Sequence, residues 1–302
     1  MRPPDPIKIL NLILLLTVGH LTEACPASAR EVRDATQTTV TLKPVPRRVV
    51  TLAPSLAETV SEILGDALDR IVGVSEYTDY PAILKKRESI GPFFKVNLEK
   101  IMALKPDLVL ATTDGNSKEQ IGHLRELGMP VIVVSTASFK EIEESIRLVG
   151  QALGSPERGE QVASQLHRGV EHIRERAKTH PKRRVLLQLG DEPIVVAGKN
   201  TFLNEAVQAV GATNLYGDVN SSYPRPSLED IVMRNAEVIV IFAMGADQKP
   251  YYSMASHWLQ FPTILAVKER HVHIVQGDTI LRPSLRLLEG LSLLEGSIYG
   301  KK

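Results

Sequence analysis

Four apolar runs of strand length divide the first half of the chain. They are Val49–Leu52, Ile71–Val74, Leu108–Ala111 and Val131–Val134. Each is separated from the next by a helical or looped stretch, and runs without polar alternation are typical of strands buried on both faces. This alternation predicts a parallel sheet with crossover helices.

The second half restarts the same pattern. Strands are predicted at Val185–Gln188, Val238–Phe242 and Val272–Val275, helices near Leu203–Val210 and Leu228–Arg234, and a closing helix at Pro283–Tyr299. Apolar residues at helical spacing, Leu287, Leu291, Leu294 and Ile298, mark the buried stripe of that last helix. The pattern therefore predicts an N-terminal α/β lobe over residues 30–154 and a C-terminal α/β lobe over residues 181–302.

Residues 155–180 predict one long helix between the lobes. Ser155 is a good N-cap, Pro156 suits the first helical turn, and Pro181 ends an apolar stripe that begins at Val162. Roughly 23 residues at 1.5 Å each make a rod of about 35 Å, the length of a small domain. Such a rod limits how far the two lobes can move.

Ser55 to Glu58, directly after Pro54, match a capping box at the start of a first helix. That interpretation gives Glu58 a structural role.

A sequence repeat links the two predicted lobes. NLEKIMALKPDLVL begins at Asn97 and SLEDIVMRNAEVIV begins at Ser227, which places Glu99 and Glu229 at matching positions 130 residues apart, since 229 − 99 = 130. Each Glu falls in a first helical turn, where the helix dipole favours a carboxylate. Two carboxylates could serve a glycosidase, but matched helix starts in two lobes favour a pair that points outward.

Composition and charge narrow the class of protein. The chain has 302 residues, 43% of them apolar and 24% charged, with a formal net charge of +1. These values are typical of globular proteins and give no basic excess for nucleic-acid binding.

The first 29 residues predict a cleavable signal peptide. Arg2 and Lys8 precede an apolar run, and Ala27 to Ala29 provide a small-residue cleavage site. Cleavage there removes Cys25, the single cysteine, and sends the protein to the periplasm. The alternative is a lipoprotein anchored through Cys25.

Motifs for catalysis or metal binding are missing from the sequence. It contains no G-x-S-x-G, G-x-G-x-x-G or H-E-x-x-H pattern, and its histidines are scattered. We therefore expect no protein metal site, no resident cofactor and no enzymatic activity. Three aromatic loops, at residues 76–81, 91–94 and 222–226, instead predict a ligand site at strand ends.

At these residues the chain resembles the periplasmic substrate-binding proteins of ABC importers for cobalamin, ferric siderophores and haem, and most closely the cobalamin-binding members. The resemblance rests on RVVTLAPSLAETV, IVGVSEYTDYP, NLEKIMALKPDLVLAT, RVLLQLG, YPRPSLEDIV and QGDTILRPSLR. It implies two Rossmann-like lobes joined by a single long bridging helix, a ligand held between them and little lobe closure.

The resemblance also implies roles for particular residues. Ligand contacts fall on Tyr77, Phe93, Tyr223, Asp278 and Arg282. Glu99 and Glu229 correspond to the pair that docks on arginines of a permease dimer in the inner membrane.

The expected ligand is cobalamin or another corrinoid, bound by a monomer. Phe93 and Tyr223 stand where cobalamin-binding members have tryptophan. A ferric siderophore or haem is therefore the alternative ligand on the same fold, and a secreted glycoside hydrolase is the alternative of another class.

Overall fold

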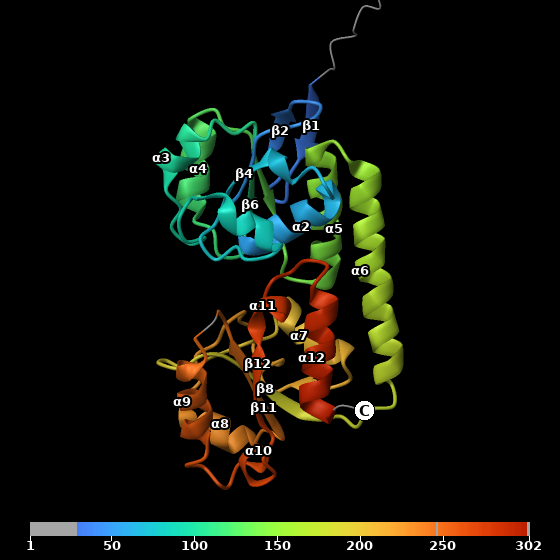
Figure 1. Ribbon diagram of the computed structural model, residues 1–302. Coiled ribbons are helices and arrows are strands. Elements are labelled where there is room, and N and C mark those ends of the chain that lie inside the picture. Colours follow the sequence, from blue (N-terminus) through green and yellow to red (C-terminus); the bar gives the residue numbers. More distant parts are fainter. Residues whose placement is uncertain (1–28, 246, 301–302) are drawn as a thin grey trace, which may run out of the picture.

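The structure is a computed structural model that describes residues 29–245 and 247–300 (Figure 1). Two α/β lobes lie one above the other, and one long helix runs along the side of both. The predicted signal peptide and Cys25 lie outside the described residues. Within these residues, no helix is both long enough and apolar enough to cross a membrane.

The N-terminal lobe is built on a parallel sheet of order β5-β4-β3-β6-β7. Its strands are β3 (Val49–Thr51), β4 (Ile71–Val74), β5 (Glu88–Ser89), β6 (Leu108–Thr112) and β7 (Val131–Val134). Every residue of β6 and β7 is buried, as expected for parallel strands whose sequences lack polar alternation. The four predicted strands are confirmed. Strand β5 was not predicted, because it consists of two polar residues and no apolar run marks it.

The C-terminal lobe repeats this order. Its strands are β8 (Arg184–Gly190), β9 (Val195–Val196), β10 (Thr213–Asn214), β11 (Val238–Ala243) and β12 (Val272–Gln276). The parallel path is β10-β8-β11-β12, and β9 adds an antiparallel pairing to β8. Ranked by chain position within each lobe, β4-β3-β6-β7 and β10-β8-β11-β12 both give the order 2-1-3-4. Open sheets of this order bind ligands beyond the carboxyl ends of their strands, where the order reverses.

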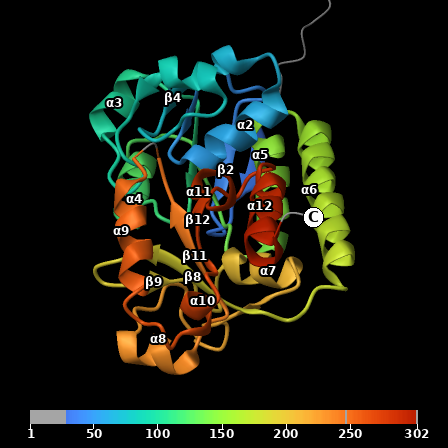
Figure 2. The same ribbon diagram turned by 60° about the horizontal axis from the view of Figure 1, so that its bottom comes forward.

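Helices cover both sheets (Figure 2). The N-terminal lobe has α2 (Pro54–Leu64), α3 (Leu98–Ala103), α4 (Lys118–Glu126) and α5 (Phe139–Leu153). The C-terminal lobe has α7 (Phe202–Ala209), α8 (Leu228–Arg234), α9 (Lys249–Trp258), α10 (Leu265–Lys268), α11 (Gly277–Ile280) and α12 (Leu287–Tyr299). Short 3-10 helices occupy Leu68–Arg70 and Ala82–Lys86. The predicted α/β class is confirmed.

The long connection is helix α6 (Pro156–Ala177), whose 22 residues span about 33 Å. Its buried stripe includes Val162, Leu166 and Val170, and it packs against α5 of one lobe and α12 of the other. At the α5 crossing, a Cβ on Gly150 would lie 2.6 Å from the Cα atom of Gly159. The two helices pack closely there because both positions lack a side chain.

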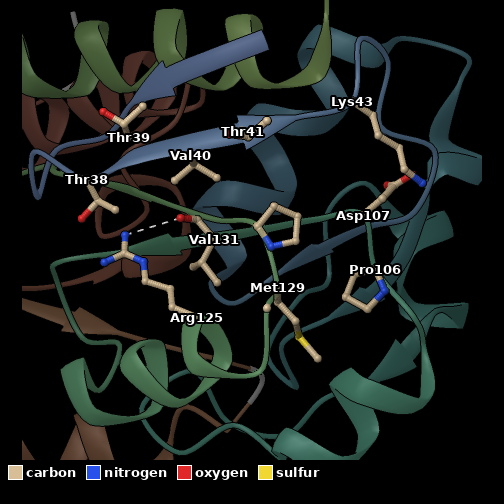
Figure 3. A pocket seen from close by; sticks show the side chains of 12 residues that line it. Thr38, Thr39, Val40, Thr41, Lys43, Pro106, Asp107, Arg125, Met129 and Val131 are labelled. Carbon is tan, nitrogen blue, oxygen red and sulfur yellow. Dashed lines mark hydrogen bonds and ion pairs between the residues drawn. The ribbon is translucent and has the colours of Figure 1, made fainter. Parts of the chain in front are cut away.

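A hairpin of β1 (Arg30–Arg33) and β2 (Thr39–Leu42) lies against the β7 edge. Its buried Asp34 accepts hydrogen bonds from the Val133 amide, at 3.0 Å, and from Arg125, at 2.5 Å. Between β2 and the start of β7 lies a groove of about 560 Å³ (Figure 3). Asp107, on its wall, precedes β6, so the groove lies at the amino ends of the strands, away from the edge expected to bind ligand.

Two helix starts differ from their predictions. Helix α2 has Ala53 as its N-cap, without a side-chain hydrogen bond, so the predicted capping box at Ser55 is wrong. Pro54 itself begins that helix, which places Glu58 beyond the first turn. Helix α12 begins at Leu287 rather than Pro283, because the preceding four residues turn to make contacts with the other lobe.

Candidate functional site between the lobes

The carboxyl ends of the two sheets face each other at the lobe boundary. Tyr77 follows β4, Asp114 follows β6, and Asp278 follows β12. Figure 1 places α11, which carries Asp278, directly below the N-terminal lobe. Contacts between these loops, described below, cross from one lobe to the other, so the site lies where sheets of this order bind ligands.

Arg282 is the centre of one group of predicted ligand residues. Its Nη2 donates to Asp278 at 2.9 Å and to the Tyr77 carbonyl at 3.2 Å, while its Nη1 donates to Asp79 at 2.5 Å and to Glu58 at 3.2 Å. Three of these four acceptors belong to the N-terminal lobe. The structure therefore brings Tyr77, Asp278 and Arg282 together, and it makes Arg282 a link between the lobes.

Glu58 is a buried carboxylate in this group, with 1% of its surface exposed. It accepts hydrogen bonds from Ser284 at 2.6 Å and from Arg286 at 3.0 Å, in addition to the bond from Arg282. Burial raises the pKa of Glu58 above its ordinary value, and the Ser284 hydroxyl and the two guanidinium groups oppose that rise. These three partners all belong to the C-terminal lobe.

Phe93 lies on a second group of loops. Its ring covers Gly115, because a Cβ at that position would lie 2.6 Å from the Phe93 Cε2 atom. Gly115 has a φ of +100°, which a residue with a side chain rarely adopts. The buried Asn116 amide fixes the arrangement by donating to the carbonyls of Phe93, at 2.6 Å, and Leu52, at 3.1 Å. Phe93 is thus held at the ends of β3 and β6.

Tyr223 of the C-terminal lobe meets the same loop. Its phenol lies close enough to the Asp114 carboxylate, across the lobe boundary, for each group to shift the pKa of the other. Both residues are exposed to solvent, and 37% of the Tyr223 surface is accessible. Burial raises the pKa of Tyr223, as does the neighbouring charge of Asp114. The phenol therefore holds its proton.

The two groups of loops are joined within the N-terminal lobe. The Glu76 amide, next to Tyr77, donates to the Gly91 carbonyl at 2.9 Å, two residues before Phe93. Tyr77 itself is 51% exposed. The five predicted ligand residues thus lie on loops that meet at the lobe boundary. Their contact with a ligand stays a prediction.

Glu99 and Glu229 are both exposed, one on each lobe. The Asn97 side chain accepts from the Lys100 amide and the Ser227 hydroxyl accepts from the Asp230 amide, so each Glu lies in the first turn of a side-chain-capped helix, as predicted. Figures 1 and 2 place α3 and α8 at opposite ends of the molecule. A hydrogen bond from its own amide, and a second from Ser227, lower the pKa of Glu229.

The described residues contain no group of three or more His, Cys, Asp or Glu side chains placed to hold a metal ion. His271, just before β12, and His273, within it, lie near Arg183, whose guanidinium is 3.1 Å from the His271 Nδ1 atom. Burial and the positive neighbours lower the pKa of His273.

A sequence model described as periplasmic binding protein matches residues 49–278. The chain belongs to the periplasmic binding protein family. An uncharacterized ABC transporter substrate-binding lipoprotein of Bacillus subtilis is 33% identical to this chain over 289 residues, which cover 92% of the chain and 87% of that protein. A protein named vitamin B12-binding protein, from Vibrio vulnificus, is 30% identical over 82% of this chain and 89% of its own length.

Solved structures of the family share the fold. The periplasmic vitamin B12 binding protein of Vibrio cholerae superposes with a TM-score of 0.73 and 26% identity, covering 84% of this chain and 96% of that one. The resemblance found in the sequence is therefore confirmed at the level of family and fold.

Sequence reasoning missed the three carboxylates Glu58, Asp79 and Asp114, as well as Ser284 and Arg286, which contact Glu58. Glu58 was assigned to a helix cap, and no role was expected for Asp79 or Asp114. Asp79 and Asp114 follow strand ends, which is a usable signal for a cleft residue. For Glu58 the only signal is a carboxylate within a run of buried helical residues, from Ser55 to Val60, and that signal does not name its partners.

Proposed function

We propose that this periplasmic binding protein captures cobalamin or a related corrinoid between its lobes and delivers it to an ABC permease. The named vitamin B12-binding relatives are the observation that carries this ligand class. Delivery needs capture and release, without a bond being broken. In this proposal a signal peptide directs the chain to the periplasm, where it acts as a monomer.

The residues between the lobes suit a large, flat and rigid ligand. Tyr77, Phe93 and Tyr223 supply aromatic surface from both lobes, and Asp278 supplies a polar group. Aromatic side chains give much contact area for little conformational entropy, and loops that are already fixed reduce the ordering that binding requires. The hydrogen bond from Asn116 that holds the Phe93 loop in place supports a largely preformed site.

The proposed docking surface uses Glu99 and Glu229. Both carboxylates are exposed at the start of a short helix in separate lobes, as two-point recognition by a pair of arginines on a permease dimer requires. Changing both residues to Ala is expected to leave ligand affinity unchanged and to abolish delivery in vesicles containing the permease. A loss of ligand affinity instead would place these residues at the ligand site and contradict the docking role.

A ferric siderophore or haem is the second candidate ligand. Tyrosine oxygen can coordinate ferric iron, and both Tyr77 and Tyr223 reach the lobe boundary. The raised pKa of Tyr223 opposes iron coordination at that residue, because a phenol must lose its proton to bind iron as tyrosinate. Corrinoid binding is favoured by the vitamin B12-binding relatives.

A glycoside hydrolase using Glu99 and Glu229 is not supported. That chemistry needs two carboxylates roughly 5–10 Å apart. Figures 1 and 2 place α3 and α8 at opposite ends of the molecule, on separate lobes.

Titration of the purified protein with cyanocobalamin, haem and a ferric hydroxamate tests the ligand class. Calorimetry and visible absorbance are suited to this, because the single tryptophan, Trp258, is buried against Gln188 in the C-terminal lobe. We expect saturable one-to-one binding of cyanocobalamin. Binding of an iron complex alone would overturn the corrinoid proposal and leave the family assignment intact.

Two matched variants test whether the ligand binds between the lobes. Phe93→Ala removes aromatic surface between the lobes, and Phe261→Ala removes a partly buried ring from the C-terminal core, where it packs near Trp258. We expect cobalamin affinity to fall by at least about tenfold in the first variant, the effect of roughly 1.4 kcal/mol of lost contact. The second should keep the affinity of the parent protein. Equal affinity in both variants would place the ligand elsewhere.

A further inference from the structure

The two lobes are joined by a buried ionic cluster in addition to helix α6. We define this cluster, called the lobe clamp, as Glu58 with Arg282, Ser284 and Arg286. The partners of Glu58 lie more than 220 residues away in the sequence, between α11 and α12. Because the contacts come from opposite lobes, they act directly on the distance and angle between the lobes.

Glu58 occupies the centre of the lobe clamp. One of its oxygens accepts from both guanidinium groups, Arg286 at 3.0 Å and Arg282 at 3.2 Å, and the other accepts from Ser284 at 2.6 Å. The side-chain exposure of Glu58 is 1%, compared with 12% for Arg282 and 20% for Arg286. A single buried carboxylate therefore holds two cations together that would otherwise repel each other.

The arginines are held from their other sides as well. Arg282 donates to Asp79 and Asp278, and the Arg286 guanidinium lies 4.0 Å from the centre of the Tyr80 ring. Each terminal nitrogen of an arginine carries two hydrogens. The two acceptors at Nη1 and the two at Nη2 therefore engage every terminal N–H of Arg282, which leaves it a fixed orientation before any ligand arrives.

Helix α2 is a rigid base for this carboxylate. Seven of its eleven residues are buried, including Leu56, Ala57 and Val60 around Glu58. The residues between α11 and α12 are fixed in turn by the Arg286 amide, which donates to Ser284 at 3.2 Å. Both sides of the lobe clamp are therefore pre-organised.

We propose that Glu58 is the positioning residue of the site between the lobes: it sets the lobe spacing and orients Arg282 and Arg286. The expected effect of Glu58 on cobalamin affinity rests on the proposed function, whereas its expected effect on lobe spacing is independent of the ligand. Arg282 then acts mainly as a link between the lobes rather than as a ligand contact, since its terminal N–H groups bind protein acceptors.

The test measures lobe spacing and affinity separately. Spin labels on Glu119→Cys in α4 and Lys268→Cys in α10, in a Cys25→Ser background, report the distance between the lobes. Both labelled positions are exposed. We expect Glu58→Gln, without ligand, to broaden and shift the distance distribution, and to weaken cyanocobalamin binding by roughly tenfold or more.

Glu62→Gln is the matched control. It lies one turn further along α2, and its carboxylate makes no hydrogen bond within the part of the chain that the structure describes. It should reproduce the parent distances and affinity. If Glu58→Gln folds, as circular dichroism reports, and also matches the parent in lobe distance, the proposal is overturned.

Ser284→Ala covers the case in which Glu58→Gln does not fold. It removes one neutral donor and keeps both ion pairs, so we expect a smaller change in the same direction. An unchanged distance distribution in Ser284→Ala would then overturn the proposal. A changed lobe distance in a protein whose parent binds no cobalamin would support the lobe clamp and reject the corrinoid proposal, so the two failures are distinguishable.

Discussion

The segments that carry Glu99 and Glu229 share a backbone and differ in what holds it in place. Both begin with a side-chain N-cap, Asn97 or Ser227, and both end with a residue of positive φ, Lys105 at 45° and Asn235 at 52°. These are matching positions, since 105 + 130 = 235. Each segment then enters a matching strand of the shared 2-1-3-4 order, β6 or β11.

The residue after each Glu carries opposite charge in the two segments. Lys100 forms an exposed ion pair with Glu88 at 2.9 Å. Asp230 instead accepts a hydrogen bond at 2.7 Å from the buried Tyr216 hydroxyl and pairs with Arg234. The N-cap at each helix start therefore depends on residues within the segment, whereas the contacts that anchor the helix depend on neighbours that differ between the lobes.

The largest expected effect on stability comes from a buried isoleucine that the two segments share. Ile101 and Ile231 occupy matching positions and are both fully buried, each in a separate apolar core. Ile101→Ala and Ile231→Ala should each lower the free energy of unfolding by about 2–5 kcal/mol through lost burial and the cavity left behind. Urea unfolding followed by circular dichroism measures both.

The exposed methionines of the same helices serve as controls. Met102 is 40% exposed and Met233 is 78% exposed. Their Ala variants should stay within about 0.5 kcal/mol of the parent protein. A cost below about 1 kcal/mol for only one of the two isoleucine variants would show that the helices are not packed equivalently.

The equivalence of the two segments is the part of the molecule that sequence could predict. Apolar runs and N-caps are local signals, so seven strands, the bridging helix and the helices that carry Glu99 and Glu229 were placed from residues close together in the chain. The lobe clamp could not be predicted in this way, because Glu58 and Arg282 are 224 residues apart and no periodicity links them. The same holds for the contact between Asp114 and Tyr223, which exists only once the lobes meet.

The second prediction tests the anchoring that only the C-terminal segment has. Tyr216→Phe removes the hydroxyl that donates to Asp230 while it keeps the buried ring. Loss of a bond to a charged acceptor should lower the free energy of unfolding by about 1.5–3 kcal/mol. The matched change in the other segment, Lys100→Met, breaks an ion pair whose partners are 48% and 52% exposed, and it should cost about 0–1 kcal/mol. Equal costs in urea unfolding would contradict the difference in anchoring.

The smallest expected effect separates the two positive-φ positions. Lys105→Gly relieves the strain of a left-handed backbone, which costs a residue with a side chain about 1–2 kcal/mol. The greater flexibility of glycine in the unfolded chain offsets about 0.5–1 kcal/mol of that gain. The free energy of unfolding should therefore rise by about 0.5 kcal/mol. Asn235→Gly should lower it by about 1 kcal/mol, because the Asn235 side chain accepts a hydrogen bond at 2.8 Å from the Leu265 amide at the start of α10. Lys105→Ala keeps the strained backbone and should bring no gain. Changes of the same sign in the two Gly variants, measured by urea unfolding, would mean that Asn235 is retained only for its backbone conformation, as Lys105 is.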